Sequence, residues 1–137
     1  MNRLIDTSTE YSIYDDVLES LKYLNRKKIP MGVLANWTKN LEKIIKKVGI
    51  YKYFDFIFSS SESKYSKPDP RIFSDLMSNV IREYKKIYYV GDDYDLDVNS
   101  ARLAGFVPIL IDRSRRYLDK SGCIKISSLK DIREVVL

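Results

Sequence analysis

Four carboxylates are crowded into six residues of the segment Gly91-Asp92-Asp93-Tyr94-Asp95-Leu96-Asp97, directly after an apolar run over residues 88–90. So dense a cluster repels itself, and a hard divalent cation such as Mg²⁺, which takes carboxylate and water oxygens, would offset the repulsion. The alternative is a helix N-terminus, where acidic side chains cap free N–H groups and interact well with the helix dipole. Capping alone seldom requires four acids, so the cluster favours a Mg²⁺ site.

Two further junctions carry residues that could bind an anion. Lys67 lies between two prolines in Ser66-Lys67-Pro68-Asp69-Pro70, and a cation held there could neutralise an anionic substrate. Taken alone, a solvent-exposed loop lysine is the better explanation, because the chain has 24 Lys and Arg residues. Asn36 follows the apolar run 33–35 just before a helix N-terminus, which is a natural anion site. Asn36 or Thr38 could equally be a simple N-cap.

The composition limits which chemistry is available. Histidine is absent, which removes Ser-His and Cys-His catalysis and histidine metal sites. Cys123 is the only cysteine, so intramolecular disulfides are excluded and a reducing cytoplasm is expected. The net charge of +5 is spread among 19 acidic residues, which indicates a solvated surface and argues against nucleic acid as a partner. No apolar run approaches the roughly 20 residues of a membrane span, so we expect a soluble protein without a membrane partner.

The elements that must position these side chains alternate in type. Apolar residues at helical spacing predict helices over 14–27, 38–48, 71–84, 95–104 and 129–136. Apolar runs predict strands over 29–35, 54–58, 86–90, 107–111 and 123–126. Such alternation indicates βαβ units, and hence an α/β, doubly wound parallel sheet with helices on both faces, in a single domain of residues 1–137. Residues 1–12 fit this pattern poorly.

The order and spacing of the three motifs resemble the haloacid dehalogenase (HAD) superfamily over about residues 14–112. In that family a strand ends in Ser or Thr followed by Asn, a later loop supplies a Lys often written Lys-Pro-Asp-Pro, and a last motif reads Gly-Asp-x-x-x-x-Asp. This chain has Ala35-Asn36, Lys67-Pro68-Asp69-Pro70, and Gly91-Asp92 followed by Asp97. The resemblance implies a three-layer, Rossmann-like HAD core.

The resemblance also implies roles for individual residues. Asp92 and Asp97 would hold Mg²⁺, directly or through water, and Lys67 would act in catalysis by binding the phosphoryl group and the nucleophile. Asn36 would contribute to the phosphate cradle. The implied activity is that of a Mg²⁺-dependent phosphatase acting on a small phosphorylated molecule. A response-regulator receiver shares the sheet, a Lys and an acidic pair, but its acidic pair comes early and its Lys late, the reverse of the order here.

The resemblance breaks at the nucleophile. Family catalysis begins with an Asp-x-Asp motif on the first strand, whose leading carboxylate attacks phosphorus. The nearest candidate is Asp6, which has no second Asp after it, and Ala35 stands where the family has a hydroxyl. We therefore expect a core without its first strand and cap, catalytically incomplete as given. The alternative is a non-catalytic HAD-like binding or assembly protein that pairs with a partner or a second copy through an open sheet edge.

Overall fold

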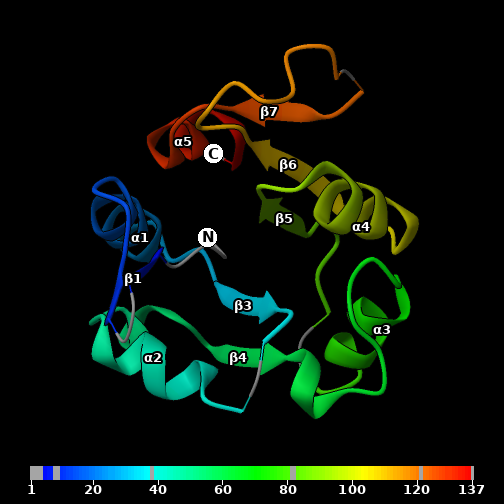
Figure 1. Ribbon diagram of the computed structural model, residues 1–137, viewed down its shortest axis with the longest axis horizontal. Coiled ribbons are helices and arrows are strands. Elements are labelled where there is room, and N and C mark those ends of the chain that lie inside the picture. Colours follow the sequence, from blue (N-terminus) through cyan, green and yellow to red (C-terminus); the bar gives the residue numbers. More distant parts are fainter. Residues whose placement is uncertain (1–4, 8–9, 38, 81–82, 121, 137) are drawn as a thin grey trace.

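The computed structural model describes residues 5–7, 10–37, 39–80, 83–120 and 122–136 (Figure 1). The strands are β1 (Ile5–Thr7), β2 (Glu10–Ser12), β3 (Gly32–Ala35), β4 (Phe56–Ser59), β5 (Tyr88–Gly91), β6 (Val107–Ile111) and β7 (Ile124–Ile126). The α-helices are α1 (Val17–Arg26), α2 (Leu41–Lys47), α3 (Arg71–Met77), α4 (Ser100–Leu103) and α5 (Ile132–Val136). Short 3₁₀ turns span Tyr51–Tyr53, Ser60–Glu62 and Leu129–Asp131, and a π-helical segment, Tyr94–Asn99, runs into α4.

The strands pair in three groups. β3 and β4 are parallel, with Val33 opposite Ile57, and β5, β6 and β7 form a second parallel group in which Val90 is opposite Ile109. β1 and β2 form a separate antiparallel pair. Helices connect β3 to β4 and β5 to β6, as parallel pairs commonly require, so the predicted α/β class is confirmed.

Two apolar clusters make the fold three-layered. One cluster joins α1, α2 and α5 to strand residues such as Val33 and Ile109, and the other joins α3 and α4 to Leu34, Phe58 and Tyr89. Both clusters include residues of β3 and of the β5–β7 group, so the two groups of strands share the same two helical layers. Figure 1 shows this arrangement, with α1, α2 and α5 on one side of the strands and α3 and α4 on the other.

The facing edges of β3 and β5 are a distinct feature of the sheet. The Met31 carbonyl accepts from the N–H of Asp55, the residue before β4. Because the backbone N–H and C=O groups of a strand alternate in direction from residue to residue, those of Gly32 and Leu34 point away from β4. On β5 the Ile87 carbonyl accepts from the Val107 N–H of the β6 strand. By the same alternation, the backbone N–H and C=O groups of Tyr88 and Val90 point away from β6. Within the described part of the chain, no strand lies between these two edges.

Some predicted bounds differ from the structure. The helix predicted over 71–84 ends at Met77, where Ser78 and Asn79 turn their side chains back to the Asp75 carbonyl and compete with the helical bonds. The segment 1–12, which fitted no pattern, contributes the β1–β2 pair. Among the helices described, none has the length and apolar character needed to cross a bilayer.

Candidate active site

Lys67 lies at the centre of the candidate site. Only 7% of the residue is exposed, and its ammonium donates to Asp97 Oδ1 at 2.5 Å and to the Tyr89 hydroxyl at 2.8 Å. Burial alone would lower the pKa of Lys67, but Tyr89 and Asp97 raise it above its usual range. The group is therefore an ammonium at neutral pH, and the solvent-exposed loop lysine that the motif alone would suggest is excluded.

Asn36 fixes the backbone of the lysine loop. Its side-chain Nδ2 donates to the Lys67 carbonyl at 2.9 Å, and its Oδ1 accepts from the Lys67 N–H at 2.9 Å. Because β3 ends just before Asn36, this pairing attaches the loop to the carboxyl end of the strand. The side chain is exposed, and its place in a phosphate cradle remains a prediction. Thr38, the alternative N-cap, lies outside the described residues.

Asp97 is the carboxylate that meets Lys67 inside the molecule. It is 2% exposed, and its second oxygen, Oδ2, accepts from the Asp93 N–H at 3.0 Å. A Cβ on Gly91 would lie 2.3 Å from Asp97 Cβ, Cγ and Oδ2. Gly91 is thus required by the close approach of this side chain to the strand end, which explains why a glycine opens the acidic segment.

The other acids of the cluster divide between capping and exposure. Asp93 caps the π-helical segment by accepting from the Leu96 N–H at 2.9 Å, as the capping alternative predicted for it. Asp95 is exposed and accepts from the Asn99 side chain at 3.4 Å. Asp92 is half-buried at the end of β5. A π-helical turn at this point is notable because such turns are rare and occur often at functional sites.

The donor chemistry of this segment fits Mg²⁺ in part. Asp92 and Asp97 offer hard oxygens, but Asp97 already accepts from Lys67 and Asp93, and the described residues contain no group of three or more acids arranged around one point. Mg²⁺ commonly binds proteins through one or two carboxylates and completes its shell with water and substrate phosphate. These two residues are therefore compatible with such a shell, with Asp97 acting through water.

Two residues that the family's chemistry depends on stand out. Asp6, the candidate nucleophile, lies in β1 opposite Tyr11, and its side chain is outside the described part of the chain. Ala35 ends β3 with 5% of its surface exposed and offers no hydroxyl at that position. The described residues thus supply the lysine and the acids of the site.

Tyr89 belongs to the site, although the sequence did not indicate it. The apolar run 88–90 predicts a buried strand, and a tyrosine there reads as part of the core. Its ring is in the core beside Phe73, while its hydroxyl reaches Lys67 and the Leu34 carbonyl. The only signal was the general tendency of a buried tyrosine to find a polar partner for its hydroxyl.

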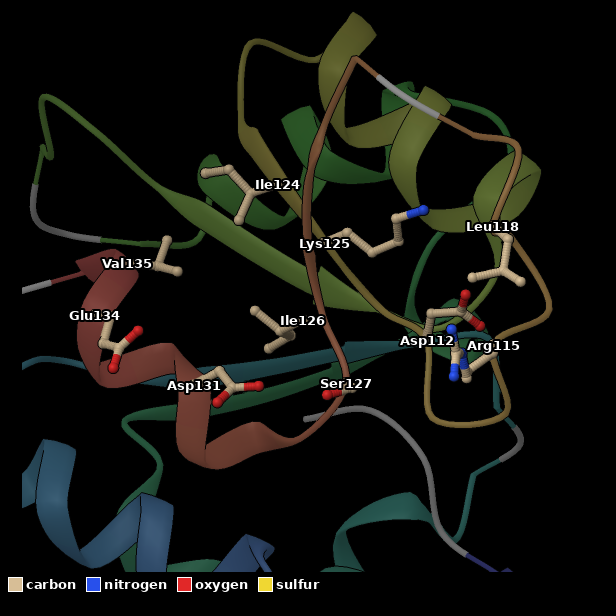
Figure 2. Close-up of a pocket in the computed structure, with 10 residues that line it drawn as sticks. All are labelled: Asp112, Arg115, Leu118, Ile124, Lys125, Ile126, Ser127, Asp131, Glu134 and Val135. Carbon is tan, nitrogen blue, oxygen red and sulfur yellow. The ribbon is translucent and has the colours of Figure 1, made fainter.

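A separate groove of about 420 Å³ lies along β7 (Figure 2). Its walls come from Ile124 and Ile126 on β7, Val135 on α5, and the loop that carries Asp112 and Leu118. One of its charged groups, Asp112, has internal partners, since it accepts from the N–H groups of Arg116 and Tyr117. None of the residues lining the groove belongs to the Lys67 site.

The fold, with a lysine and acids at the strand ends, is a Rossmann-like α/β core. A family model described as haloacid dehalogenase-like hydrolase matches residues 2–111. The chain therefore belongs to the haloacid dehalogenase-like hydrolase family.

Individual relatives agree with this assignment. The chain is 29% identical over 103 residues to haloacid dehalogenase-like hydrolase domain-containing protein 3 of Danio rerio, covering 75% of this chain and 43% of the relative. It is 30% identical over 129 residues to a phosphoserine phosphatase of Thermus thermophilus, covering 93% of this chain and 51% of that protein. A HAD phosphatase from Thermococcus onnurineus has the same fold, with a TM-score of 0.83, 23% identity, and coverage of 90% of this chain and 58% of that one. The chain thus spans about half the length of these relatives.

Proposed function

We propose that the chain forms the lysine- and acid-bearing part of a Mg²⁺-dependent phosphatase site for a small phosphorylated molecule, and that it is catalytically incomplete as it stands. Its relatives support the substrate class, because two of them are named as phosphatases, one for phosphoserine and one for glyceraldehyde 3-phosphate. We place this function in the cytoplasm.

The observation that carries the proposal is the state of the Lys67 ammonium. An ammonium has three N–H donors, and two of them go to Asp97 and Tyr89. The third N–H has no acceptor among the residues that the structure describes and remains for a phosphoryl oxygen, at the edge where β3 and β5 both end. A buried cation held in this way by fixed partners stabilises negative charge without reorganising during the reaction.

The proposal assigns tasks to four residues of the site. Lys67 binds a phosphoryl oxygen, Asn36 holds the lysine loop and adds a polar group to the phosphate cradle, and Asp97 keeps the ammonium oriented. Asp92 would hold Mg²⁺ with Asp97 in the outer shell, and the bound cation would neutralise phosphate charge. The nucleophile would come from a carboxylate that is outside this cluster, for which Asp6 is the candidate within the chain.

The test is hydrolysis of p-nitrophenyl phosphate by the 137-residue chain, with Mg²⁺, with EDTA, and with Asp92→Asn, alongside calorimetric titration of Mg²⁺ and of inorganic phosphate. Binding of both without hydrolysis is the expected result. Hydrolysis abolished by EDTA and by Asp92→Asn would show that the chain supplies its own nucleophile, and Asp6→Asn would then identify it. Absence of both binding events at millimolar concentration would overturn the proposal.

A second candidate function is a non-catalytic binding or assembly protein, and the open edges of β3 and β5 favour it. Gly32 and Leu34 on one side, and Tyr88 and Val90 on the other, direct backbone groups into an interval that no described strand occupies. Edges of this kind recruit an extended segment of another chain, including a second copy.

Hydrogen exchange tests this alternative. We expect the amides of Leu34 and Val90 to exchange faster than those of Val33 and Tyr89, and to become protected at concentrations where light scattering detects association. A strict monomer whose edge amides are already protected would contradict the assembly function.

A further inference from the structure

The Tyr89 hydroxyl occupies a fixed position between two polar groups. It accepts from the Lys67 ammonium and donates its only proton to the Leu34 carbonyl, each at 2.8 Å. A phenolic oxygen has one proton to give. Since that proton is taken by the carbonyl, the hydroxyl can meet the lysine only as an acceptor. The Leu34 carbonyl of β3 therefore makes Tyr89 the acceptor and Lys67 the donor in the contact between them.

The ring of Tyr89 cannot move away from this position easily. The residue is 9% exposed, and its ring meets Phe73 edge to face, with centroids 4.9 Å apart and an interplanar angle of 88°. Phe73 also contacts Phe106 in the same apolar cluster, so the ring that packs against Tyr89 is itself held in place. Packing against Phe73 holds the ring of Tyr89, and the bond to the Leu34 carbonyl holds its hydroxyl, so the side chain is rigid.

Two rigid acceptors fix the direction of the lysine's remaining donor. Asp97 holds one N–H of Lys67 and Tyr89 holds a second, and the geometry at nitrogen then determines where the third points. Replacing Tyr89 with phenylalanine would keep the aromatic packing but leave one lysine N–H and the Leu34 carbonyl without this partner. The ammonium could then turn toward Asp97.

We propose that Tyr89 is a positioning residue, which connects the Leu34 carbonyl of β3 to the Lys67 ammonium and aims the free N–H of the lysine at the bound anion. The proposal rests on the function proposed above in taking a phosphoryl oxygen as that anion. It assigns no chemical step to Tyr89, whose effect is exerted entirely through Lys67.

The test compares Tyr89→Phe with Tyr88→Phe. Tyr88 is the half-buried neighbour whose ring packs against the opposite cluster, so its variant controls for the loss of a tyrosine hydroxyl from β5. Two readouts are needed: the ¹⁵Nζ chemical shift of Lys67 measured by NMR at one neutral pH, and the affinity for inorganic phosphate measured by calorimetry. In Tyr89→Phe we expect a shifted Lys67 signal and phosphate affinity reduced about tenfold, the effect of losing one hydrogen bond to a charged group.

The outcomes separate this proposal from the proposed function. An unchanged Lys67 signal in Tyr89→Phe, or an equal change in Tyr88→Phe, would overturn the positioning role. If the wild type bound no phosphate but the Lys67 signal still shifted in Tyr89→Phe, the positioning of Lys67 would stand and the phosphatase function would fall. Should Tyr89→Phe fail to fold, 3-fluorotyrosine at position 89 keeps both hydrogen bonds but weakens the oxygen as an acceptor. The Lys67 signal must then still shift.

Discussion

At the scale of single residues, Lys67 and Asp97 form a buried pair that is stable only as a pair. Each has less than a tenth of its surface exposed, and their charged atoms are 2.5 Å apart. Removing two charges from water is costly, and mutual attraction with additional hydrogen bonds offsets the cost. Tyr89 and the Asp93 N–H supply those bonds. Such an arrangement contributes little net stability, but it makes the loss of one partner severe.

Lys67→Met should therefore destabilise the protein by about 3–5 kcal/mol, because it leaves the Asp97 carboxylate buried without its cation. Urea unfolding followed by circular dichroism measures the change. Lys64→Met is the matched control, since Lys64 is an exposed lysine three residues before Lys67, and its change should stay within about 0.5 kcal/mol. Adding Asp97→Leu to Lys67→Met should restore part of the loss. Equal effects of the two lysine variants would show that Lys67 is not the buried partner.

At the scale of elements, periodicity and apolar runs located the parallel strands and the helices between them, but not the contacts that build the site. The pairing of Asn36 with Lys67 spans 31 residues and leaves no local pattern. Likewise, four neighbouring acids look alike in sequence, and only packing separates buried Asp97 from capping Asp93 and exposed Asp95. The resemblance to the family singled out Lys67, which is buried, although composition favoured an exposed lysine.

The two hydrogen bonds between the Asn36 side chain and the Lys67 backbone should slow the exchange of the Lys67 amide. In Asn36→Ala the Lys67 amide loses its acceptor, so we expect its exchange to quicken and the free energy of unfolding to fall by about 1–2 kcal/mol. Asn79→Ala is the control, because it removes a surface amide that donates to the Asp75 carbonyl. A Lys67 amide that exchanges at the same rate in Asn36→Ala as in the wild type would contradict this role.

The start of the π-helical segment depends on Asp93 and not on Asp95. Asp93→Ala removes the acceptor of the Leu96 N–H and should cost about 1 kcal/mol, the usual cost of losing an N-cap. Asp95→Ala removes only an exposed carboxylate with a long contact to Asn99, and thermal unfolding should show little change. The reverse order of the two effects would mean that the cap has been assigned to the wrong acid.

At the scale of the whole molecule, Asp16 joins the two ends of the chain. Its carboxylate accepts two bonds from the Arg113 guanidinium, at 2.8 and 2.9 Å, and one each from the Ser128 hydroxyl and the Leu129 N–H at 2.8 Å. These partners follow β6 and β7, whereas Asp16 directly precedes α1. One residue thus anchors α1 to the loop after β6 and to the turn before α5, which encloses the larger apolar cluster.

This network predicts a specific loss of stability in acid. Burial alone would raise the pKa of Asp16, but the hydrogen bonds from Arg113, Leu129 and Ser128, with the Arg113 charge, lower it from 3.8 to about 2. A carboxyl whose pKa is depressed by folding stabilises the protein above its unfolded pKa, and the contribution disappears as the pH falls through the folded pKa. Asp16 should therefore contribute about 2 kcal/mol near neutral pH, and lose it between about pH 4 and pH 2.

Urea unfolding at a series of pH values tests this contribution through Asp16→Asn. The variant should be less stable at pH 7, and the difference from the wild type should shrink steadily as the pH falls toward 2, because the wild-type carboxyl is then protonated as well. Asp15→Asn, at the exposed neighbouring position, should track the wild type throughout. If the gap between Asp16→Asn and the wild type stayed constant with pH, the carboxylate charge would not be the source of the stabilisation. The connection between the two ends of the chain would then rest on packing alone.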